Sequence, residues 1–529
     1  SNQEERNPTT ARINKNYRNE PLIVSLTSYP ARIDKIAPCL KSILNQSIKA
    51  DKVILWLAES EFPQKESSLP EEILALTEQG LEIKWCENYR SYKKLIPALL
   101  MYPEAVIVTA DDDAIYGKDW LKQLYDSYLQ CNEKMIHCHR ITKVFCPDNR
   151  FHIISASKSL WSIPTYLHKL TGLGGVLYPP HSLHEKVLDP RFLTIAPTND
   201  DLWFWAMAVM NGVRIKSVKN ATPCPELIKE TQTVALTNIN DRGEQLFWKD
   251  FDALLSEFPI FKETLETEYL YMKKVERFSK LMTKADENFW KDLVIEDRKI
   301  ALLIWYYRRT GDYLNLDHPI SFNEKIQWSK LFQSTDLKTK LADKYEVREW
   351  VKEKIGADYL VPIYGVWDKF EEIDFDDLPK QFVLKTNHGS GMNLIVTDKD
   401  KLNLDVAKDK FTQWLNRHYG LSASQELHYL KIKPKIIAEE FIAEMGDLPD
   451  YKFFCLDGKV EFVWVDTARF TDHRRDFFDL NWNHLNVTSE YKNADQIPQK
   501  PKHFEEMLKL AETLSQGMDQ VRVDLYETR

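Results

Sequence analysis

The sequence has no apolar run of the roughly 18 to 20 residues that a helix needs to cross a bilayer. Residues 1–20 lack the apolar core of a signal peptide, so we expect no secretory leader. The chain also lacks a starting methionine, which predicts a trimmed or engineered end. These absences predict no transmembrane segment and favour a cytoplasmic protein.

The chain also has no excess of basic residues. The net charge of -9 at pH 7 argues against a nucleic-acid-binding surface, because phosphate contacts need clustered lysine and arginine. With 43% hydrophobic and 12% aromatic residues the chain is globular rather than disordered. Its 529 residues suffice for two to four domains with ample core.

Cysteine is scattered without a pattern. The seven cysteines stand at positions 39, 86, 131, 138, 146, 224 and 455, with no CxxC pair. An odd, unpatterned set in a long chain is typical of reduced thiols in a cytosolic enzyme. The tract MIHCHR, residues 135–140, has a composition that suits zinc, but the alternation of a β-strand is the favoured interpretation.

From about residue 20 the chain alternates between strand-like and helix-like stretches. PLIVSLTSY and DKVILWLA have strand patterns, IAPCLKSILNQ and PEEILALTEQ carry helical spacing, and the series continues to EAVIVTA. This order predicts an α/β fold over residues 20–235, with a mostly parallel sheet covered by helices. Ligands are then expected at the carboxyl ends of the strands.

The pattern changes after residue 235. Residues 236–310 hold charged and aromatic amphipathic segments with few turn signals, which predict a helical connector. Residues 311–529 return to strands rich in apolar and aromatic residues and are expected to form a second, α+β domain. There is no internal repeat and no long low-complexity tract.

Three adjacent carboxylates, Asp111, Asp112 and Asp113, follow the strand EAVIVTA at one of these carboxyl ends. Their mutual repulsion has to be offset by a cation, by helix-start amides or by solvent. Mg²⁺ and Mn²⁺ favour hard oxygen ligands and commonly join one or two carboxylates to substrate phosphates. The alternative is that one of these aspartates caps the helix near KDWLKQLYDSYL.

Three further stretches favour a ligand site. YRSYKKLIPAL supplies basic side chains for an anionic phosphate or sugar, TGLGGVLYPP a flexible glycine turn, and PTNDDLWFWAMAV a carboxylate pair at a helix start. A carboxylate of that pair either acts as a general base on a hydroxyl or caps the helix. The residues concerned are Arg90, Lys93 and Lys94; Gly172, Gly174 and Gly175; and Asp200 and Asp201.

Together with IVSLTSYPARI at residues 23–33, these ordered motifs resemble a glycosyltransferase of the GT-A fold. They are most similar to the family-2-like capsule and lipopolysaccharide transferases that begin with the pattern (I/V)SLTSYPxRI. The resemblance covers about residues 20–235. It implies an inverting displacement in which Mn²⁺ or Mg²⁺, held by Asp111 and Asp113, stabilises the departing diphosphate of a nucleotide sugar.

The same resemblance implies roles for further residues. Asp201, or Asp200, serves as the catalytic base. Residues implied at the nucleotide sugar are Thr27, Tyr29, Arg32, Arg90, Lys93, Lys94, Asp111, Asp112, Gly174 and Gly175. For Thr27, Tyr29 and Arg32, an ordinary strand-to-helix turn remains the alternative.

A second set of motifs lies in the last third of the chain. FVLKTNHGSGMNLIV, residues 382–396, is a strand, a small-residue loop and a strand, with the spacing of neither a Walker A motif nor a dinucleotide fingerprint. Such a loop can fold over a triphosphate, although a plain tight turn is the alternative. IIAEEFI, DYKFFCLDGKVEFVWV and VRVDLY follow, and strand alternation puts Arg522 and Asp524 on one face.

This order resembles the ATP-grasp superfamily, and more narrowly its TupA-like branch from teichuronopeptide biosynthesis. HPISFNEKIQWSKLF, residues 318–332, is similar to the usual lead-in of that branch, and the resemblance covers about residues 311–529. It implies Asp524 as a metal ligand and Lys338 or Lys344 as a further lysine near the nucleotide. The ATP-binding residues that it implies are Lys385, His388, Gly389, Ser390, Gly391, Glu439, Glu440, Ile442, Lys452 and Arg522.

There is one departure from this pattern. ATP-grasp enzymes usually continue past the RVD strand to a return strand with another metal-binding glutamate. This sequence stops at Arg529, so we expect a domain that lacks its last strand and whose ligase activity is in question.

The two resemblances together imply a bifunctional bacterial enzyme of capsule or cell-surface polysaccharide synthesis. One domain transfers a sugar, expected from a UDP-sugar such as UDP-glucuronate, to a polysaccharide acceptor. The other uses ATP to join a carboxylate, expected on a uronic acid, to a small amine. Attachment to the inner membrane is expected only through assembly partners. The alternatives are a single active domain beside a glycan- or partner-binding module, and an ATP-grasp sugar kinase.

Overall fold

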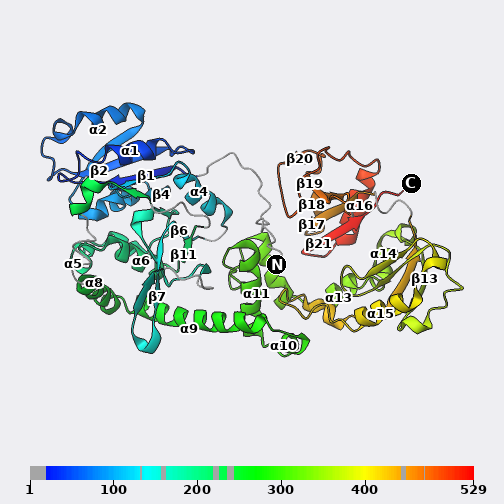
Figure 1. Cartoon of the computed structure of the whole chain (residues 1–529). Helices are drawn as coiled ribbons and strands as arrows, with labels where there is room; N and C mark the ends of the chain where they lie inside the picture. The colour runs from blue at the N-terminus through cyan, green and yellow to red at the C-terminus, as the bar shows by residue number, and fades with distance from the viewer. Residues whose placement is uncertain are drawn as a thin grey trace. The chain divides into compact units, whose positions relative to one another are not determined.

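The structure is a computed structural model of the whole chain (Figure 1). It describes residues 20–131, 134–155, 162–218, 225–234, 244–442, 448–469 and 471–528. These residues form two compact units, which divide between Arg277 and Phe278.

A seven-stranded sheet forms the centre of the N-terminal unit, in the order β11-β6-β10-β4-β1-β2-β3. β3, β2, β1 and β4 run parallel, β10 is antiparallel to both of its neighbours, and β6 and β11 are parallel. The strands are Leu22–Thr27 (β1), Lys52–Ala58 (β2), Leu81–Cys86 (β3), Val106–Thr109 (β4), Ile136–Cys138 (β6), Val176–Tyr178 (β10) and Ile215–Ser217 (β11).

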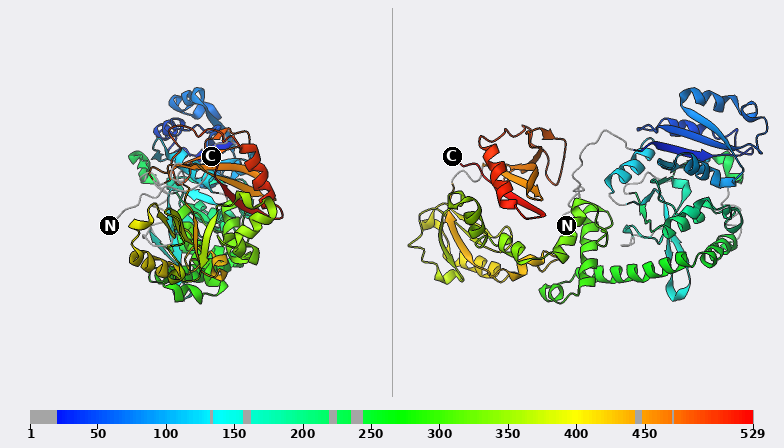
Figure 2. Two further views of the ribbon diagram at one scale, coloured as in Figure 1. Left: turned by 90° about the vertical axis from the view of Figure 1, so that its right-hand side faces the viewer. Right: turned by 180° about the vertical axis from the view of Figure 1, so that it is seen from behind.

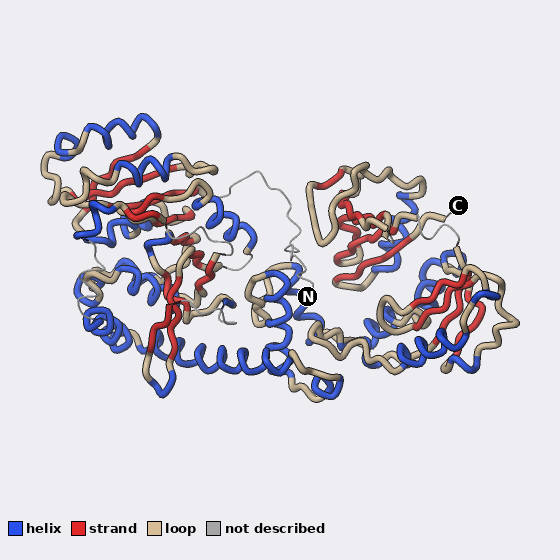
Figure 3. Tube along the Cα trace, in the orientation of Figure 1, coloured by secondary structure: helices blue, strands red, loops and turns tan. Residues whose placement is uncertain are grey.

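Helices pack on this sheet, and the central strands are buried on both faces, as a parallel sheet requires (Figure 3). One side of the core joins alternate residues of β1 and β4 to the apolar faces of the first and fourth helices. The helices of this part are Ala37–Leu44 (α1), Glu71–Ala75 (α2), Ile96–Met101 (α3), Trp120–Gln130 (α4), Phe192–Ile195 (α5) and Asp200–Met210 (α6). α6 is apolar almost all round, which suits its burial along nearly its whole length.

Smaller elements complete this part of the chain. A three-stranded sheet has the order β8-β7-β9, and β12 pairs with β5. These strands are Ala114–Ile115 (β5), Ile141–Phe145 (β7), His152–Ser155 (β8), His168–Leu170 (β9) and Glu226–Leu227 (β12). Two 3₁₀ turns, Arg90–Lys94 (η3) and Gly172–Gly174 (η6), matter for the site, and two long helices follow, Glu244–Glu257 (α8) and Pro259–Met282 (α9).

The C-terminal unit contains a four-stranded antiparallel sheet, in the order β13-β16-β14-β15. Its strands are Ile363–Trp367 (β13), Phe382–Thr386 (β14), Asn393–Val396 (β15) and Ile436–Glu440 (β16). Helix α15 packs on it through Ala407 and Phe411. The helices up to this sheet and on it are Glu287–Lys291 (α10), Ile295–Thr310 (α11), Phe322–Phe332 (α12), Asp336–Ala342 (α13), Val347–Ile355 (α14) and Leu404–Leu415 (α15).

A five-stranded antiparallel sheet, in the order β20-β19-β18-β17-β21, follows in the same unit. Helix α16, Phe504–Ser515, lies on one face of this sheet (Figure 2). Its apolar side chains share a core cluster with Phe453 and Val465. The strands are Asp450–Leu456 (β17), Lys459–Thr467 (β18), Arg474–Phe478 (β19), His484–Leu485 (β20) and Gln520–Leu525 (β21).

The predicted fold class is confirmed: a mostly parallel α/β sheet comes first, helices follow, and antiparallel sheets come last. The helix expected near KDWLKQLYDSYL is α4, and the segments predicted as a connector contain α8, α9, α10 and α11 where they are described. The strand interpretation of MIHCHR is confirmed by β6. Six cysteines are free thiols, and Cys224 lies outside the described residues. Within the described ranges, no helix combines the length and apolarity that crossing a membrane demands.

Candidate functional site

The aspartate triad lies at the carboxyl end of β4, between that strand and β5. Two of its members are held by Arg32, whose Nη1 lies 2.5 Å from Asp112 Oδ1 and 3.3 Å from Asp113 Oδ2. Ser28 Oγ donates a hydrogen bond of 2.6 Å to the other oxygen of Asp112. Burial raises the pKa of Asp112, and the nearby Arg32 guanidinium works against this rise.

The capping interpretation is wrong for the triad. Helix α4 begins only at Trp120, and its N-cap residue is Asp119, whose side chain accepts no cap hydrogen bond. The repulsion among the three carboxylates is therefore offset first by cations of the chain itself.

The second of these cations is Lys94, which ends η3. Its Nζ lies 3.0 Å from Asp111 Oδ1, 3.0 Å from Asp200 Oδ2 and 3.7 Å from Asp201 Oδ1. Although burial works against the charge, these carboxylates hold the pKa of Lys94 well above its usual range. Lys94 thus joins the triad to the aspartate pair of α6.

The aspartate pair differs in exposure. Asp200 exposes 8% of its side chain, and burial raises its pKa against the effect of Lys94. Asp201 exposes 25% and accepts a 2.7 Å hydrogen bond at Oδ2 from the backbone N–H of Gly172. The N-cap of α6 is Asn199, so the structure does not show either aspartate as the N-cap residue.

The glycine turn makes room for this contact. A Cβ at Gly172 would lie 2.8 Å from Asp201 Oδ1 and 2.9 Å from Lys94 Nζ. Gly175 has φ +90° and faces the Trp120 ring, and the carbonyl of Gly174 accepts a hydrogen bond of 2.7 Å from Trp120 Nε1. The flexible turn expected from the sequence is therefore packed, with its backbone against Asp201 and Trp120.

The remaining residues expected at the nucleotide sugar lie around this edge. Lys93 Nζ is 2.6 Å from Glu61 Oε2, Thr27 Oγ1 donates to the carbonyl of Trp56 over 2.8 Å, and Arg90 is exposed. The guanidinium of Arg32 lies 5.6 Å from the centre of the Tyr29 ring.

A pocket of about 700 Å³ opens at the carboxyl ends of β2 and β3. It is lined by Glu59, Ser60, Cys86, Glu87 and Asn88. Sequence reasoning singled out none of these residues, nor Ser28 and Glu61. Ser28 lies inside the motif IVSLTSYPARI, so the motif could have pointed to it as a residue of the site.

The charge of this edge suits a divalent cation. Arg32, Lys94 and the nearby Lys169 face five aspartates, which leaves the carboxylates in excess by two. Asp111 exposes 27% of its side chain and Asp113 13%, whereas Asp112 is enclosed. Asp111 and Asp113 are therefore the residues that would hold the ion. Among the described residues, no cluster of three or more His, Cys, Asp or Glu side chains is preformed for a metal.

In the C-terminal unit, two lysines approach the small-residue loop after β14. Lys385 Nζ on β14 lies 2.5 Å from Glu439 Oε2 on the neighbouring β16. Lys344 Nζ donates to the carbonyl of Gly389 in the loop. Burial, with Lys385 close by, lowers the pKa of Lys344 to about 8. Of the two earlier lysines considered from the sequence, Lys344 is the one that contacts this loop.

The loop itself bends at two glycines. Gly389 has φ +83° and packs against the ring of Tyr419, while Gly391 has φ +75° and faces open space. Ser390 is exposed between them. The His388 ring turns the other way, with Nε2 3.1 Å from the carbonyl oxygens of Trp414 and Arg417. His388 therefore anchors the loop.

The strand β16 ends in the expected carboxylates. Glu439 is buried, Glu440 is exposed, and Ile442 is half-buried beyond the strand. The backbone N–H of Glu440 donates to the carbonyl of Pro362 over 2.9 Å.

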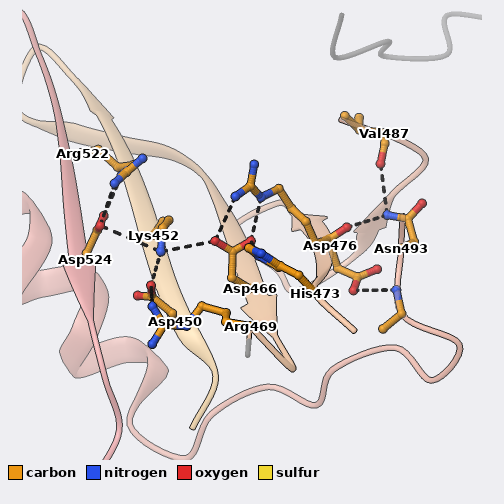
Figure 4. A network of polar contacts seen from close by, with 12 residues as sticks. Asp450, Lys452, Asp466, Arg469, His473, Asp476, Val487, Asn493, Arg522 and Asp524 are labelled. Carbon is orange, nitrogen blue, oxygen red and sulfur yellow. Dashed lines mark hydrogen bonds and ion pairs between the residues drawn. The ribbon is translucent and has the colours of Figure 1, made fainter. Parts of the chain in front are cut away.

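The face of the five-stranded sheet opposite α16 carries a network of charged side chains (Figure 4). The Lys452 ammonium contacts Asp450 and lies 3.4 Å from Asp466 Oδ2 and 3.9 Å from Asp524 Oδ2. Arg522 binds both oxygens of Asp524, each over 2.7 Å. Arg522 and Asp524 thus share one face, as strand alternation predicts.

Two arginines that sequence reasoning missed complete this network. Arg475 donates two hydrogen bonds to Asp466, of 2.6 and 3.0 Å, and lies 3.8 Å from the centre of the Trp464 ring. Arg469 Nη1 lies 2.8 Å from Asp450 Oδ2. The signal for Asp450 and Asp466 was present, since alternation along DYK and WVD puts both on the face of Lys452.

Comparison with known proteins identifies the C-terminal part. Residues 324–529 match the family model described as TupA-like ATPgrasp, which confirms the resemblance predicted from the sequence of this part of the chain. Among curated proteins, none matches the chain significantly.

Solved structures show only remote likeness. A mannosyltransferase from Pyrobaculum calidifontis in complex with GDP-Man and Mn²⁺ has 15% identity and a TM-score of 0.33, covering 50% of this chain and 72% of that one. TarS 1-349 from S. aureus has 14% identity and a TM-score of 0.29, covering 59% and 89%. The ATP-grasp ligase PsnB, complexed with minimal precursor, Mg and ADP, has 12% identity and a TM-score of 0.21, covering 48% and 61%.

Proposed function

We propose that the chain is a bifunctional enzyme of bacterial capsule or cell-surface polysaccharide synthesis. Its N-terminal unit transfers a sugar from a nucleotide donor, and its ATP-grasp domain ligates a carboxylate to an amine. The observation that carries the first activity is the convergence of Asp111 and Asp201 on Lys94. The family match carries the second.

For glycosyl transfer, Asp201 is the general base. It is the more exposed member of the pair, and Gly172 fixes one of its oxygens. It takes the proton of the acceptor hydroxyl while that oxygen bonds to the anomeric carbon and the diphosphate leaves. A divalent ion held by Asp111 and Asp113 supplies positive charge for the departing diphosphate when it is bound.

The donor is a UDP-sugar in this proposal, with UDP-glucuronate as the first candidate. The uracil and ribose of the donor extend from the triad toward the ends of β1 and β2, near Thr27, Tyr29 and Arg32. The 700 Å³ pocket at the ends of β2 and β3 offers a place for the uracil. It lies on the same edge of the sheet because β1, β2, β3 and β4 are parallel.

For ligation, the triphosphate of ATP lies at the glycine loop, where Lys344 and Lys385 supply positive charge. Glu439, Glu440 and Ile442 face adenine and ribose. Asp524 is the candidate ligand for Mg²⁺, and Lys452 and Arg522 meet phosphate oxygens. These roles are what the family resemblance implies for side chains in these positions.

The ligation proceeds in two balanced steps. A carboxylate oxygen of the substrate bonds to the γ-phosphorus of ATP, and ADP leaves. The amine nitrogen then bonds to the carbonyl carbon, the carbon–oxygen bond to phosphate breaks, and the nitrogen gives up a proton. The products are an amide, ADP and phosphate.

A uronic acid satisfies both units with one substrate class. The first activity adds a sugar that bears a carboxylate to the growing glycan, and the second amidates that carboxylate. Such a pathway uses cytoplasmic nucleotide donors, so we place the enzyme at the inner face of the membrane with its assembly partners.

Incubation of the purified protein with UDP-glucuronate, an oligosaccharide acceptor, ATP, Mg²⁺ and candidate amines tests both activities. UDP release that is lost in D201N and D111A, together with ADP release that is lost in K385M, supports the proposal. If the wild type shows only one of the two activities, and the matching variant loses it, the chain has a single active unit beside a binding module. A phosphorylated sugar in place of an amide indicates a kinase.

A further inference from the structure

Lys94 lies between two groups of carboxylates that the proposed transfer uses for different purposes. Asp111 stands on the side of the ion and the diphosphate, and Asp201 is the base. The ammonium of Lys94 is 3.0 Å from the first and 3.7 Å from the second, with Asp200 at 3.0 Å. One internal cation therefore reaches both halves of the site.

The surroundings leave this ammonium little freedom. Its side chain is enclosed, and the backbone at Gly172 approaches so closely that a Cβ there would lie 2.9 Å from Nζ. The carbonyl of Lys94 itself accepts a hydrogen bond of 2.6 Å from Ser25 Oγ on β1. Lys94 is thus fixed by the central sheet at one end and by three carboxylates at the other.

We propose that Lys94 is a positioning residue rather than a donor-phosphate ligand. It holds Asp201 at a fixed place relative to Asp111, and its charge limits how tightly the carboxylates bind a divalent ion. This inference rests on the proposed glycosyl transfer.

Two consequences follow from electrostatics. Without the ammonium, the carboxylates lose a neighbouring positive charge, so a divalent ion at Asp111 and Asp113 binds more tightly. At the same time Asp200 and Asp201 repel Asp111 without compensation, and the base moves away from its productive position. Tighter ion binding together with slower transfer is a combination that a purely structural lysine does not produce.

The test compares Lys94→Met and Lys94→Arg with the wild type, and Lys143→Met serves as the control. Lys143 lies on β7 and is also buried, and burial, rather than these aspartates, is the cause that lowers its pKa. Mn²⁺ binding is measured by electron paramagnetic resonance without any nucleotide. We expect K94M to bind Mn²⁺ about tenfold more tightly, and K94R and K143M to match the wild type.

Transfer kinetics give the second readout. In K94M we expect kcat to fall about 100-fold while KM for the donor stays within threefold, and in K94R at least a tenth of the activity to return. A donor KM that rises more than tenfold at unchanged kcat identifies Lys94 as a phosphate ligand and overturns the inference. Unchanged Mn²⁺ affinity in K94M overturns it as well.

Two further arms keep the test decisive. If K94M fails to fold, the double variant K94M/D200N removes the ion pair as a whole and is titrated with Mn²⁺ in its place. If the wild type transfers no sugar from any donor, the proposed function fails, but the Mn²⁺ titration still decides whether Lys94 controls the ion affinity of this edge.

Discussion

Lys94 Nζ and Asp200 Oδ2 lie 3.0 Å apart, although one ends a 3₁₀ turn before α3 and the other begins α6. The pair brings two distant motifs to one edge of the sheet. Asp200 is enclosed, and its neighbour Asp201 is the more exposed carboxylate of the two.

The first prediction concerns the base. Asp201→Asn removes the proton acceptor but keeps the size of the side chain, so kcat for transfer should fall by about 10² to 10⁴ with KM for the donor nearly unchanged. Steady-state assay of diphosphate release measures both. Asp119→Asn, at the N-cap of α4, is the matched control and should behave as the wild type. Full activity in D201N would assign the base elsewhere.

The second prediction concerns the two glycines of the loop after β14, where we propose that ATP binds. A methyl group at Gly389 meets the Tyr419 ring and strains a backbone at φ +83°, whereas at Gly391 it meets open space and adds only the strain of φ +75°. G391A should therefore cost about 1 kcal/mol and keep ATP binding, while G389A should weaken binding at least tenfold. Calorimetric titration with ATP and Mg²⁺ compares them, and equal affinities would refute the ordering.

The third prediction concerns pH and Lys344. Because its pKa is lowered to about 8, the ammonium that faces the loop loses its proton as the pH rises through that value. The affinity for ATP should therefore fall between pH 7 and pH 9, and K344R, which stays charged, should remove this dependence. Dissociation constants measured across this range provide the check. A flat wild-type profile would show that Lys344 does not meet the phosphates.

The fourth prediction concerns Asp466. Burial works to raise its pKa, but Arg475 and Lys452 outweigh burial and hold the pKa below its usual value. A lowered folded-state pKa contributes stability above the unfolded value, near 3.9, and that contribution is lost as the pH falls through the folded value.

Asp466→Asn leaves buried cations without their partner, so the ATP-grasp part should lose about 3 kcal/mol at pH 7. At pH 3 the difference from the wild type should be smaller. Urea unfolding at the two pH values gives the comparison. A loss that is the same at both pH values would mean that the charge of Asp466 contributes nothing.

Local patterns sufficed for much of the fold. The burial of β1 and β4, the helix α4 and the shared face of Arg522 and Asp524 all follow from periodicity over a few residues. The position of the aspartate triad follows from the end of one strand. Each of these is a local property, so a single sequence contains it.

The contacts between motifs are not local. β10, only Val176–Tyr178, inserts antiparallel beside β4, and the glycine loop before it contacts Asp201 of α6. No short window of sequence specifies that insertion. The charge of Lys94 suggested a phosphate ligand, whereas its neighbours in space are carboxylates.

The ATP-grasp network shows the same limit. Strand alternation places Asp450, Lys452 and Asp466 on one face, but the choice of partner depends on which strands are adjacent. β21 pairs with β17, and this brings Asp524 to the other side of Lys452. That pairing joins segments far apart in the chain.

The most direct test of the central claim is calorimetric titration of the whole chain with UDP in the presence of Mn²⁺. We predict that the wild type binds UDP only when Mn²⁺ is present and that the double variant D111A/D113A does not bind it. UDP binding that survives in this variant, or that is independent of Mn²⁺, would contradict the assignment of the aspartate edge.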